Sequence, residues 1–228
     1  VSDDISIYSG ELTVNNNITS NNSGSDVLFN SSNITLNAPI TSSDTSTVTI
    51  NSSGNVIDGI NGSFVGKIIS TNLLLTGNGN FYLDSTTNNV SIISAGSNAS
   101  RLGSLNFTNS NALVVGSVGS NSGIYTTGTI AISTLTGDLS VSQNINTQNT
   151  STTALILNAS QSTAAGVSSG GDLKLSGGAS ITIGANARAK LYSGSISGST
   201  GLTTITGSGS NRFRYNSDES NSNYSLSL

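Results

Sequence analysis

The chain has 228 residues, 26 of them glycine, with no cysteine and no histidine, and only 8% of its residues are charged. Ordinary soluble domains carry about 25% charged residues, so Ser, Thr, Asn and Gly must take most surface positions here. A net charge of −4 argues against a nucleic-acid groove, which needs clustered Lys and Arg. No apolar run approaches the roughly 20 residues of a membrane-spanning helix. We therefore expect no nucleic-acid partner and no membrane insertion by this segment.

A pattern in the first 30 residues returns later in the chain. Ser9–Asn30 (SGELTVNNNITSNNSGSDVLFN) recurs at Thr136–Asn158 (TGDLSVSQNINTQNTSTTALILN), and a shorter form occupies Gly170–Ile183 (GGDLKLSGGASITI). In each copy a glycine and an acidic residue precede an alternating run, and a polar gap with an isoleucine follows. The two longer copies end in a second apolar pair. This order predicts a strand, a polar corner and another strand, with a period of roughly 20 residues.

Short apolar or alternating runs bounded by Ser, Asn and Gly predict strands along the whole chain. The expected strands are Ile5–Tyr8, Leu12–Val14, Val27–Phe29, Ile34–Leu36, Val48–Ile50, Phe64–Ile69, Leu73–Leu75, Phe81–Leu83, Val90–Ile93, Leu113–Val115, Ile130–Ile132, Leu139–Val141, Leu155–Leu157, Leu173–Leu175, Ile181–Ile183, Leu191–Tyr192 and Leu202–Ile205. Helix signals are almost absent, because no apolar stripe with helical spacing persists.

Many short strands fit either a sandwich or barrel, or a parallel β-solenoid. The internal period favours the solenoid, and so do the Asn-containing corners, because Asn tolerates the left-handed backbone of sharp corners. Only 5% of the residues are aromatic and none is Trp, which suits a narrow core of Val, Ile and Leu. The predicted fold class is all-β: a right-handed parallel β-helix (β-solenoid) with about 20 residues per coil and an irregular C-terminal cap.

The repeat also predicts how the chain is divided. Solenoid coils are expected over residues 1–187, with longer loops near 95–105 and 118–129, where Gly- and Ser-rich stretches interrupt the rhythm. Residues 188–228, which hold four of the seven basic residues, are expected to form the terminal coil, cap and exit segment. The opening residues lack the basic start of a signal peptide, so we expect a processed product or a piece of a longer protein.

The acidic residues give little support for catalysis. Asp26, Asp44, Asp58 and Asp84 would approach one another if coils stack in register, as the paired carboxylates of a glycosidase do. The alternative, which we prefer, is that they are turn residues whose carboxylates cap backbone N–H groups. The chain also lacks the tandem GGxGxDxUx turns of calcium-binding β-rolls and an obvious set of oxygen ligands. We therefore expect no enzyme activity, no catalytic residue, no cofactor and no metal.

One aromatic and basic cluster stands near the end of the chain, in the run NRFRYN at residues 211–216. Arg212, Arg214 and Tyr215 are candidates for contact with an anionic glycan or a partner protein, through cation–π and bidentate hydrogen bonds. The alternative, which we prefer, is an end cap. In that case alternation would send Phe213 into the bore while the two arginines bond exposed carbonyl groups or pair with Asp218 and Glu219.

Two segments carry a resemblance to a known family. The words GGDLKLSGGASITIGANARAKLYSGSISGSTGL (Gly170–Leu202) and GSGSNRFRYNSDESNSNYSLSL (Gly207–Leu228) resemble a module of very large bacterial surface and secreted proteins of the filamentous-haemagglutinin-like type. The words LTVNNNITSN and VLFNSSNITLNAPITS (Leu12–Asn21 and Val27–Ser42) resemble general coils of the same family. The resemblance implies the end of a β-helical stretch in an exported adhesin, fibre or biofilm component.

Three functions follow as hypotheses. The first is a non-catalytic structural or adhesive rod segment of an extracellular bacterial surface protein or fibre, secreted or held at the cell surface. Its partners would be a host or environmental surface glycan or protein, or copies of itself. The second is a subunit of a self-assembling extracellular filament, joined end to end or by strand exchange. The third, a polysaccharide-active β-helix enzyme, is kept for contrast.

Overall fold

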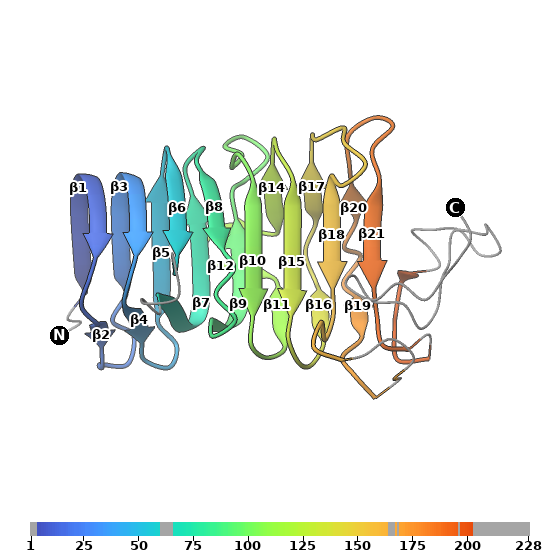
Figure 1. Cartoon of the computed structure of the whole chain (residues 1–228), viewed down its shortest axis with the longest axis horizontal. Coiled ribbons are helices and arrows are strands. Elements are labelled where there is room, and N and C mark those ends of the chain that lie inside the picture. Colours follow the sequence, from blue (N-terminus) through green and yellow to red (C-terminus); the bar gives the residue numbers. More distant parts are fainter. Residues whose placement is uncertain (1–3, 60–65, 164–166, 168, 196, 203–228) are drawn as a thin grey trace.

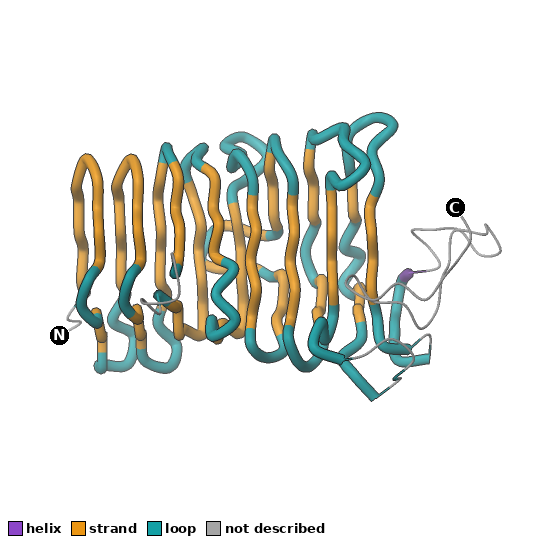
Figure 2. Tube along the Cα trace, in the orientation of Figure 1, coloured by secondary structure: helices purple, strands orange, loops and turns teal. Residues whose placement is uncertain are grey.

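The computed structural model describes residues 4–59, 66–163, 167, 169–195 and 197–202. These residues wind into a parallel β-solenoid with about 24 residues per coil. Figure 1 shows the strands side by side across the long axis, from β1 (Ile5–Val14) at one end to β21 (Ala189–Tyr192) at the other. In Figure 2, loops join the strands at the edges of the coils. The predicted all-β parallel β-helix is confirmed, whereas the predicted coil of about 20 residues is too short.

Between these two strands the others follow in chain order. The first ten are β2 (Ile18–Ser20), β3 (Val27–Leu36), β4 (Pro39–Ser42), β5 (Thr47–Ser52), β6 (Asn55–Asp58), β7 (Lys67–Thr76), β8 (Asn80–Leu83), β9 (Asn89–Ala95), β10 (Leu105–Asn109) and β11 (Leu113–Val115). The rest are β12 (Ser117–Val118), β13 (Asn121–Ser122), β14 (Ile124–Thr126), β15 (Ile130–Thr134), β16 (Leu139–Val141), β17 (Ile145–Thr147), β18 (Leu155–Asn158), β19 (Leu173–Leu175) and β20 (Ile181–Thr182). No helix among the described residues is long and apolar enough to cross a membrane.

Parallel pairing defines three sides of the solenoid, each with an inward ladder of apolar residues one coil apart. Side 1 carries Val27, Val48, Leu73, Ile93, Val115, Val141 and Leu175. Side 2 carries Leu12, Ile34, Val56, Phe81, Leu105, Ile130, Leu155 and Ala189. Side 3 is shorter and carries Ile18, Ile40 and Ile68. Strict alternation produces these ladders, because every second residue of a strand points to the same face.

Strand β5 shows how local sequence produces the ladders. In TVTINS, Val48, Ile50 and Ser52 are buried, and the residues between them are half-buried. Val and Thr are β-branched and suit a pleated, half-buried surface. The large inward side chains are fully enclosed, including Phe29, Phe81 and Phe107, each 0% exposed. Burial of each such side chain stabilises the fold by about 1.5–3 kcal/mol, so the ladders together form one continuous core.

The repeated sequence words do not all occupy the same side. Leu139, Val141 and Ile145 stack directly on Leu173, Leu175 and Ile181, so the second and third copies are true neighbours. The first copy is out of phase with them. Its Leu12 lies in the side 2 ladder with Leu155, whereas Val141 lies in the side 1 ladder with Val27. Every side of the solenoid needs the same alternating apolar pattern, so sequence segments from different sides look alike.

Insertions at the corners lengthen the coils. Ile69 pairs with Asn89, 20 residues further along, but Ile145 pairs with Ile181, 36 residues further along. Residues 96–104 connect β9 to β10. A second insertion is the antiparallel hairpin of β12 and β13, which lies against β9 with Val118 only 3% exposed. The chain then rejoins side 1 in β14, which lies within the stretch 118–129 where a long loop was predicted.

Candidate functional site

The corners of the solenoid carry the polar chemistry of the molecule. Oδ1 of Asp4 accepts the N–H of Asp26 at 2.9 Å, and Oδ1 of Asp26 in turn accepts the N–H of Thr47 at 2.8 Å. Each acceptor lies one coil before its donor, so a side-chain oxygen of one coil caps the backbone of the next. Corner residues are outside the regular strand ladder, and an unpaired backbone N–H is costly when it leaves water. The caps therefore fix one coil on another.

A second line of caps runs along the corner between sides 1 and 2. Oδ1 of Asn33 accepts the N–H of Asn55 at 2.9 Å, and Nδ2 of Asn80 donates to Oδ1 of Asn55 at 3.3 Å. Oδ1 of Asn80 then accepts the N–H of Ser104 at 3.0 Å. Uncharged amides can both donate and accept, so they stack coil on coil without the repulsion that a column of like charges would create.

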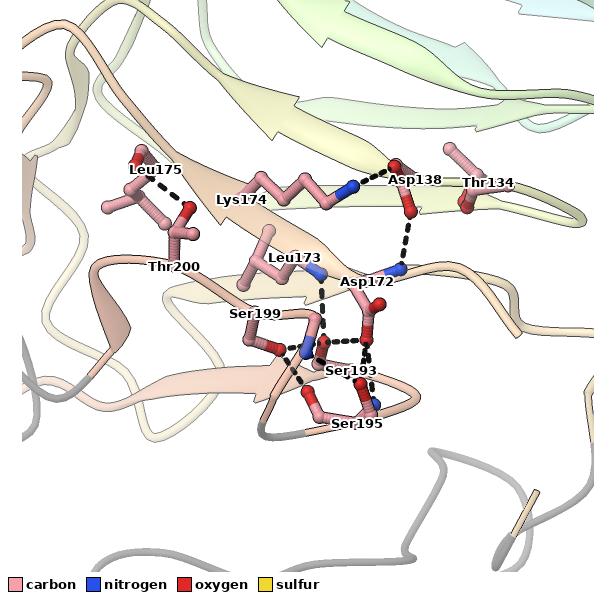
Figure 3. A network of polar contacts seen from close by, with 12 residues as sticks. Thr134, Asp138, Asp172, Leu173, Lys174, Leu175, Ser193, Ser195, Ser199 and Thr200 are labelled. Atoms are coloured by element: carbon pink, nitrogen blue, oxygen red, sulfur yellow. Dashed lines mark hydrogen bonds and ion pairs between the residues drawn. The ribbon is translucent and has the colours of Figure 1, made fainter. Parts of the chain in front are cut away.

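The densest polar network joins the last three described coils (Figure 3). Oδ1 of Asp138 accepts the N–H of Asp172 at 2.8 Å, and Oδ1 of Asp172 accepts the N–H of Ser195 at 2.7 Å. The hydroxyl groups of Ser193 and Ser195 also donate to Oδ1 of Asp172, at 3.4 Å and 3.0 Å. Asp138 and Asp172 are the acidic residues of the second and third repeat copies. Their position before a strand therefore has a structural role as a cap.

Lys174 completes this network from the outer face of β19. Its Nζ lies 2.5 Å from Oδ2 of Asp138, and the two side chains are 40% and 36% exposed. The hydrogen bond from Lys174, followed by that from the N–H of Asp172, lowers the pKa of the Asp138 carboxyl, and the same contact with Asp138 raises the pKa of Lys174. Both groups are held in their charged forms. The pair therefore acts as an ion pair across two coils.

Arg101 forms a second contact across several coils. Its Nη1 donates to the carbonyl oxygen of Thr126 at 3.2 Å and to Oδ1 of Asn146 at 2.7 Å, while Nη2 donates to Oδ1 of Asn98 at 2.7 Å. The guanidinium also lies 5.6 Å from the centre of the Tyr125 ring, within the range of a cation–π contact. The loop that carries Arg101 is thereby fastened to β14 and β17.

The acidic residues that were weighed as a glycosidase pair are spread over different environments. Asp26 caps Thr47, as the turn interpretation predicts, and Asp44 is exposed in the turn before β5. Asp84 is exposed and accepts a hydrogen bond from Nδ2 of Asn106 at 3.3 Å. Asp58 points inward and is only 2% exposed, and its burial, with a smaller contribution from the charge of Asp84, raises its pKa. An enclosed carboxyl cannot touch a polysaccharide on the outer surface.

Arg212, Arg214 and Tyr215 lie outside the described residues, so their contact with a glycan or partner stays a prediction. Sequence reasoning missed the roles of Arg101, Lys174 and Asp58. A signal existed for Asp58, because it follows Val56 by two residues and therefore takes an inward position. No comparable signal marks Arg101, whose partners lie up to 45 residues away.

Among the described residues, no group of three or more acidic side chains is arranged to hold a metal ion. On the outer surface, the large exposed apolar side chains of the described chain are Tyr8, Tyr82 and Val167, 67%, 41% and 43% exposed. Comparisons with known proteins name no relative: no protein-family description, no curated protein and no solved structure matches this chain.

Proposed function

We propose that this chain is a structural and adhesive rod segment of an extracellular bacterial surface protein or fibre, and that it is not an enzyme. The observation that carries the proposal is that both the apolar core and the polar corner contacts continue from one coil to the next. An apolar ladder runs through the coils of sides 1 and 2, and side-chain caps such as those of Asp26 and Asp172 tie corners of successive coils together. Stacked repeats of this kind derive their stability from contacts between neighbours along one axis, which suits an elongated element under load.

The outer surface supports an adhesive role. The outward ladder of side 2 runs through Thr13, Thr35, Ile57, Tyr82, Asn106, Ala131, Ile156 and Lys190. Four of these eight side chains carry a hydroxyl or amide group and one is charged. Such a surface offers hydroxyl and amide groups at the spacing of neighbouring strands, about 4.8 Å, with few charges to repel a partner. We expect glycans or proteins of a host or environmental surface to be its partners.

Force measurement tests the rod. Handles on Ser6 in β1 and Lys190 in β21 would load the solenoid along its axis. If coils peel off singly, each step should release about 24 residues, or roughly 80 Å of extended chain. Extension without any force plateau, as for a flexible linker, would contradict the rod.

Adhesion and location need separate measurements. Beads coated with the chain should bind target cells or extracellular polysaccharide, and free chain should compete with that binding. Equal binding by beads coated with an unrelated protein would refute adhesion and leave the rod untouched. Antibodies against the chain should label intact cells of the source species, and labelling only after permeabilisation would refute the extracellular location.

The cluster of Arg212, Arg214 and Tyr215 is part of this proposal as a contact site. An array of anionic glycans, probed with the chain and with the double variant Arg212→Ala, Arg214→Ala, tests it. Loss of binding in the variant, with an unchanged circular dichroism spectrum, is the expected result. Unchanged binding would remove the cluster from the adhesive surface.

Assembly into an extracellular filament is a second candidate function. The partly buried apolar side chains that pack against the core gather in the first and last described coils, and include Ile7, Leu12, Ile181 and Leu191. Contact between copies would bury them further. Electron microscopy and sedimentation should show concentration-dependent polymers, which Ile7→Lys should weaken and Thr49→Lys on the outer face of β5 should not. Single short particles at all concentrations would refute filament formation.

A further inference from the structure

Asp58 occupies a place in the core where the other coils have apolar residues. It pairs with Leu36 in β3, and because Ile57 pairs with Tyr82, it stands level with Leu83 in β8. Further along the same ladder come Phe107, Ile132 and Leu157. Asp58 is 2% exposed, and Leu36 and Leu83 are fully buried. A carboxyl group therefore interrupts an apolar stack, which is costly for its charged form.

Two donors reach this carboxyl from the coil that follows. The N–H of Ser85 donates to Oδ1 at 3.0 Å, and Nδ2 of Asn88 donates to Oδ2 at 2.8 Å. Asn88 is itself 0% exposed. Its Nδ2 also donates to the carbonyl oxygen of Leu83 at 3.2 Å, while its Oδ1 accepts the N–H of Ile68 at 2.7 Å. Asp58 thus belongs to a hydrogen-bond network that reaches β7 and the corner after β8.

This network links the end of β6 to the start of β7. The N–H of Gly59 donates to the carbonyl oxygen of Leu36 at 3.1 Å. A Cβ on Gly66 would lie 3.1 Å from the nitrogen of Gly59 and 1.8 Å from the oxygen of Leu36. Gly59 and Gly66 are therefore adjacent. Asp58 lies one residue before Gly59, and Ile68, bonded through Asn88, lies two residues after Gly66.

The surroundings decide the charge of Asp58. Burial is the largest influence and raises its pKa from 3.8 to about 6, against the opposing hydrogen bonds from Asn88 and Ser85. Strands β3, β4 and β5 carry no charged residue. Tyr82 in β8 is 41% exposed, Lys67 begins β7, and Asp84 follows β8, where its charge disfavours a second negative charge on Asp58. Asp58 is therefore mostly neutral at pH 5 and mostly ionised at pH 7.5.

We propose that Asp58 is a pH-sensitive latch of the central coils. It holds the contact between the end of β6 and the start of β7 (the β6–β7 junction, Gly59 against Gly66) closed when it is protonated and loosens this contact when it is ionised. The ionised carboxylate needs water that the apolar ladder excludes, so local opening around residues 55–59 and 66–72 hydrates it. The raised pKa of Asp58 determines how the stability of the closed junction depends on pH. Protonation stabilises the closed junction fully below about pH 4, and this stabilisation is lost as the pH rises through about 6. A difference of two pKa units corresponds to about a 100-fold change in the opening equilibrium.

Hydrogen exchange measured by mass spectrometry at pH 5.0 and pH 7.5, corrected for intrinsic exchange rates, tests the latch. In the wild-type chain, protection of residues 66–72 should fall by up to about 10-fold between the two conditions, because pH 5.0 lies only about one unit below the Asp58 pKa of about 6, whereas residues 139–147 should change much less. Asp58→Asn cannot ionise and should remove this difference. Asp26→Asn, the replacement of an exposed capping carboxylate, should leave it unchanged.

Two outcomes would overturn the latch: equal protection of residues 66–72 at both pH values in the wild type, or the same pH dependence in Asp58→Asn. If Asp58→Asn does not fold, the wild-type chain still decides the question. Nuclear magnetic resonance of the Asp58 side-chain carboxyl carbon should then show a titration midpoint near 6. A midpoint near 4 would overturn the proposal.

Discussion

The side-chain amide of Asn109 pairs with the backbone of Val90 as the backbone of a neighbouring strand would. Its Oδ1 accepts the N–H of Val90 at 2.8 Å, and its Nδ2 donates to the Val90 carbonyl oxygen at 3.0 Å. The same Nδ2 lies 2.9 Å from the carbonyl oxygen of Asn111 and 3.2 Å from that of Ala112. Asn109 is 0% exposed. One buried amide therefore closes a corner of the solenoid and extends the sheet at the same time.

Replacement of Asn109 by Ala should destabilise the fold strongly. It leaves the buried N–H of Val90 without its acceptor, at a cost of about 1–3 kcal/mol, and it also creates a small cavity. We expect a loss of about 2–4 kcal/mol in the free energy of unfolding, measured by urea titration followed by circular dichroism. Asn33→Ala is the matched control, because Asn33 is exposed and caps one N–H, so its loss should stay near 1 kcal/mol. Equal losses in both variants would contradict the role assigned to Asn109.

Buried amides and hydroxyls such as these also explain why some strands could be predicted from the sequence and others could not. Runs such as Val48–Ile50 and Leu155–Leu157 have apolar residues at both inward positions, so alternation predicted them. In β17 and β4, by contrast, one inward position is polar: Thr147 is 2% exposed and Ser42 is 7% exposed. Their hydroxyls donate to the carbonyl oxygen of Gly128 and to Oγ of Ser70. From the sequence alone, such residues resemble a turn.

The same limit applies to coil length and to the candidate site. A ladder requires alternation but does not specify how many residues lie in each corner, so the interval between Leu113 and its partner Leu139 could not be read from the repeat. The acidic residue that opens each repeat was visible, and the capping role of Asp138 and Asp172 follows from turn chemistry. The partner of Arg101, Asn146, could not be predicted, because their contact depends on the stacking of coils that differ in length.

Gly79 should be intolerant of a side chain because two coils approach closely at its corner. A Cβ at this position would lie 2.0 Å from the carbonyl oxygen of Gly54 in the preceding coil. The N–H of Gly79 also donates to the carbonyl oxygen of Ser52 at 3.0 Å, which fixes the backbone in place. Gly79→Ala must therefore push the coils apart, and we expect a loss of at least about 2 kcal/mol in urea unfolding. Gly10→Ala is the control, since a Cβ on Gly10 meets nothing within 4 Å. A neutral Gly79→Ala would show that this corner can relax.

Arg101 should fasten its loop by geometry as well as by charge. Lys at this position keeps the charge but loses the planar fork that reaches Thr126, Asn146 and Asn98 together. We expect Arg101→Lys to recover little of the stability lost in Arg101→Ala, about 1–3 kcal/mol. Both variants should show faster hydrogen exchange in residues 96–104, measured by mass spectrometry. Full recovery by Lys would mean that charge alone holds the loop.

The ion pair between Asp138 and Lys174 should affect stability in a different pH range from Asp58. The hydrogen bond that Lys174 donates to Asp138 lowers the pKa of Asp138 from 3.8. The ion pair therefore contributes to stability above about pH 4, and this contribution is lost as the pH falls further. Lys174→Gln should make the fall of stability between pH 4 and pH 2.5 shallower. It should also weaken the dependence on added salt near pH 7, because exposed pairs are screened. The change should be small, since both side chains are more than one-third exposed.

Lys190→Gln on the outer face of β21 is the matched control, because it removes one positive charge and leaves the Asp138 contact intact. Urea midpoints at pH 2.5, 4 and 7, each with and without added sodium chloride, separate the two variants. If Lys190→Gln flattens the acid limb as much as Lys174→Gln does, overall charge rather than the ion pair is responsible. If neither variant changes it, the pair contributes register between β16 and β19 but no measurable stability.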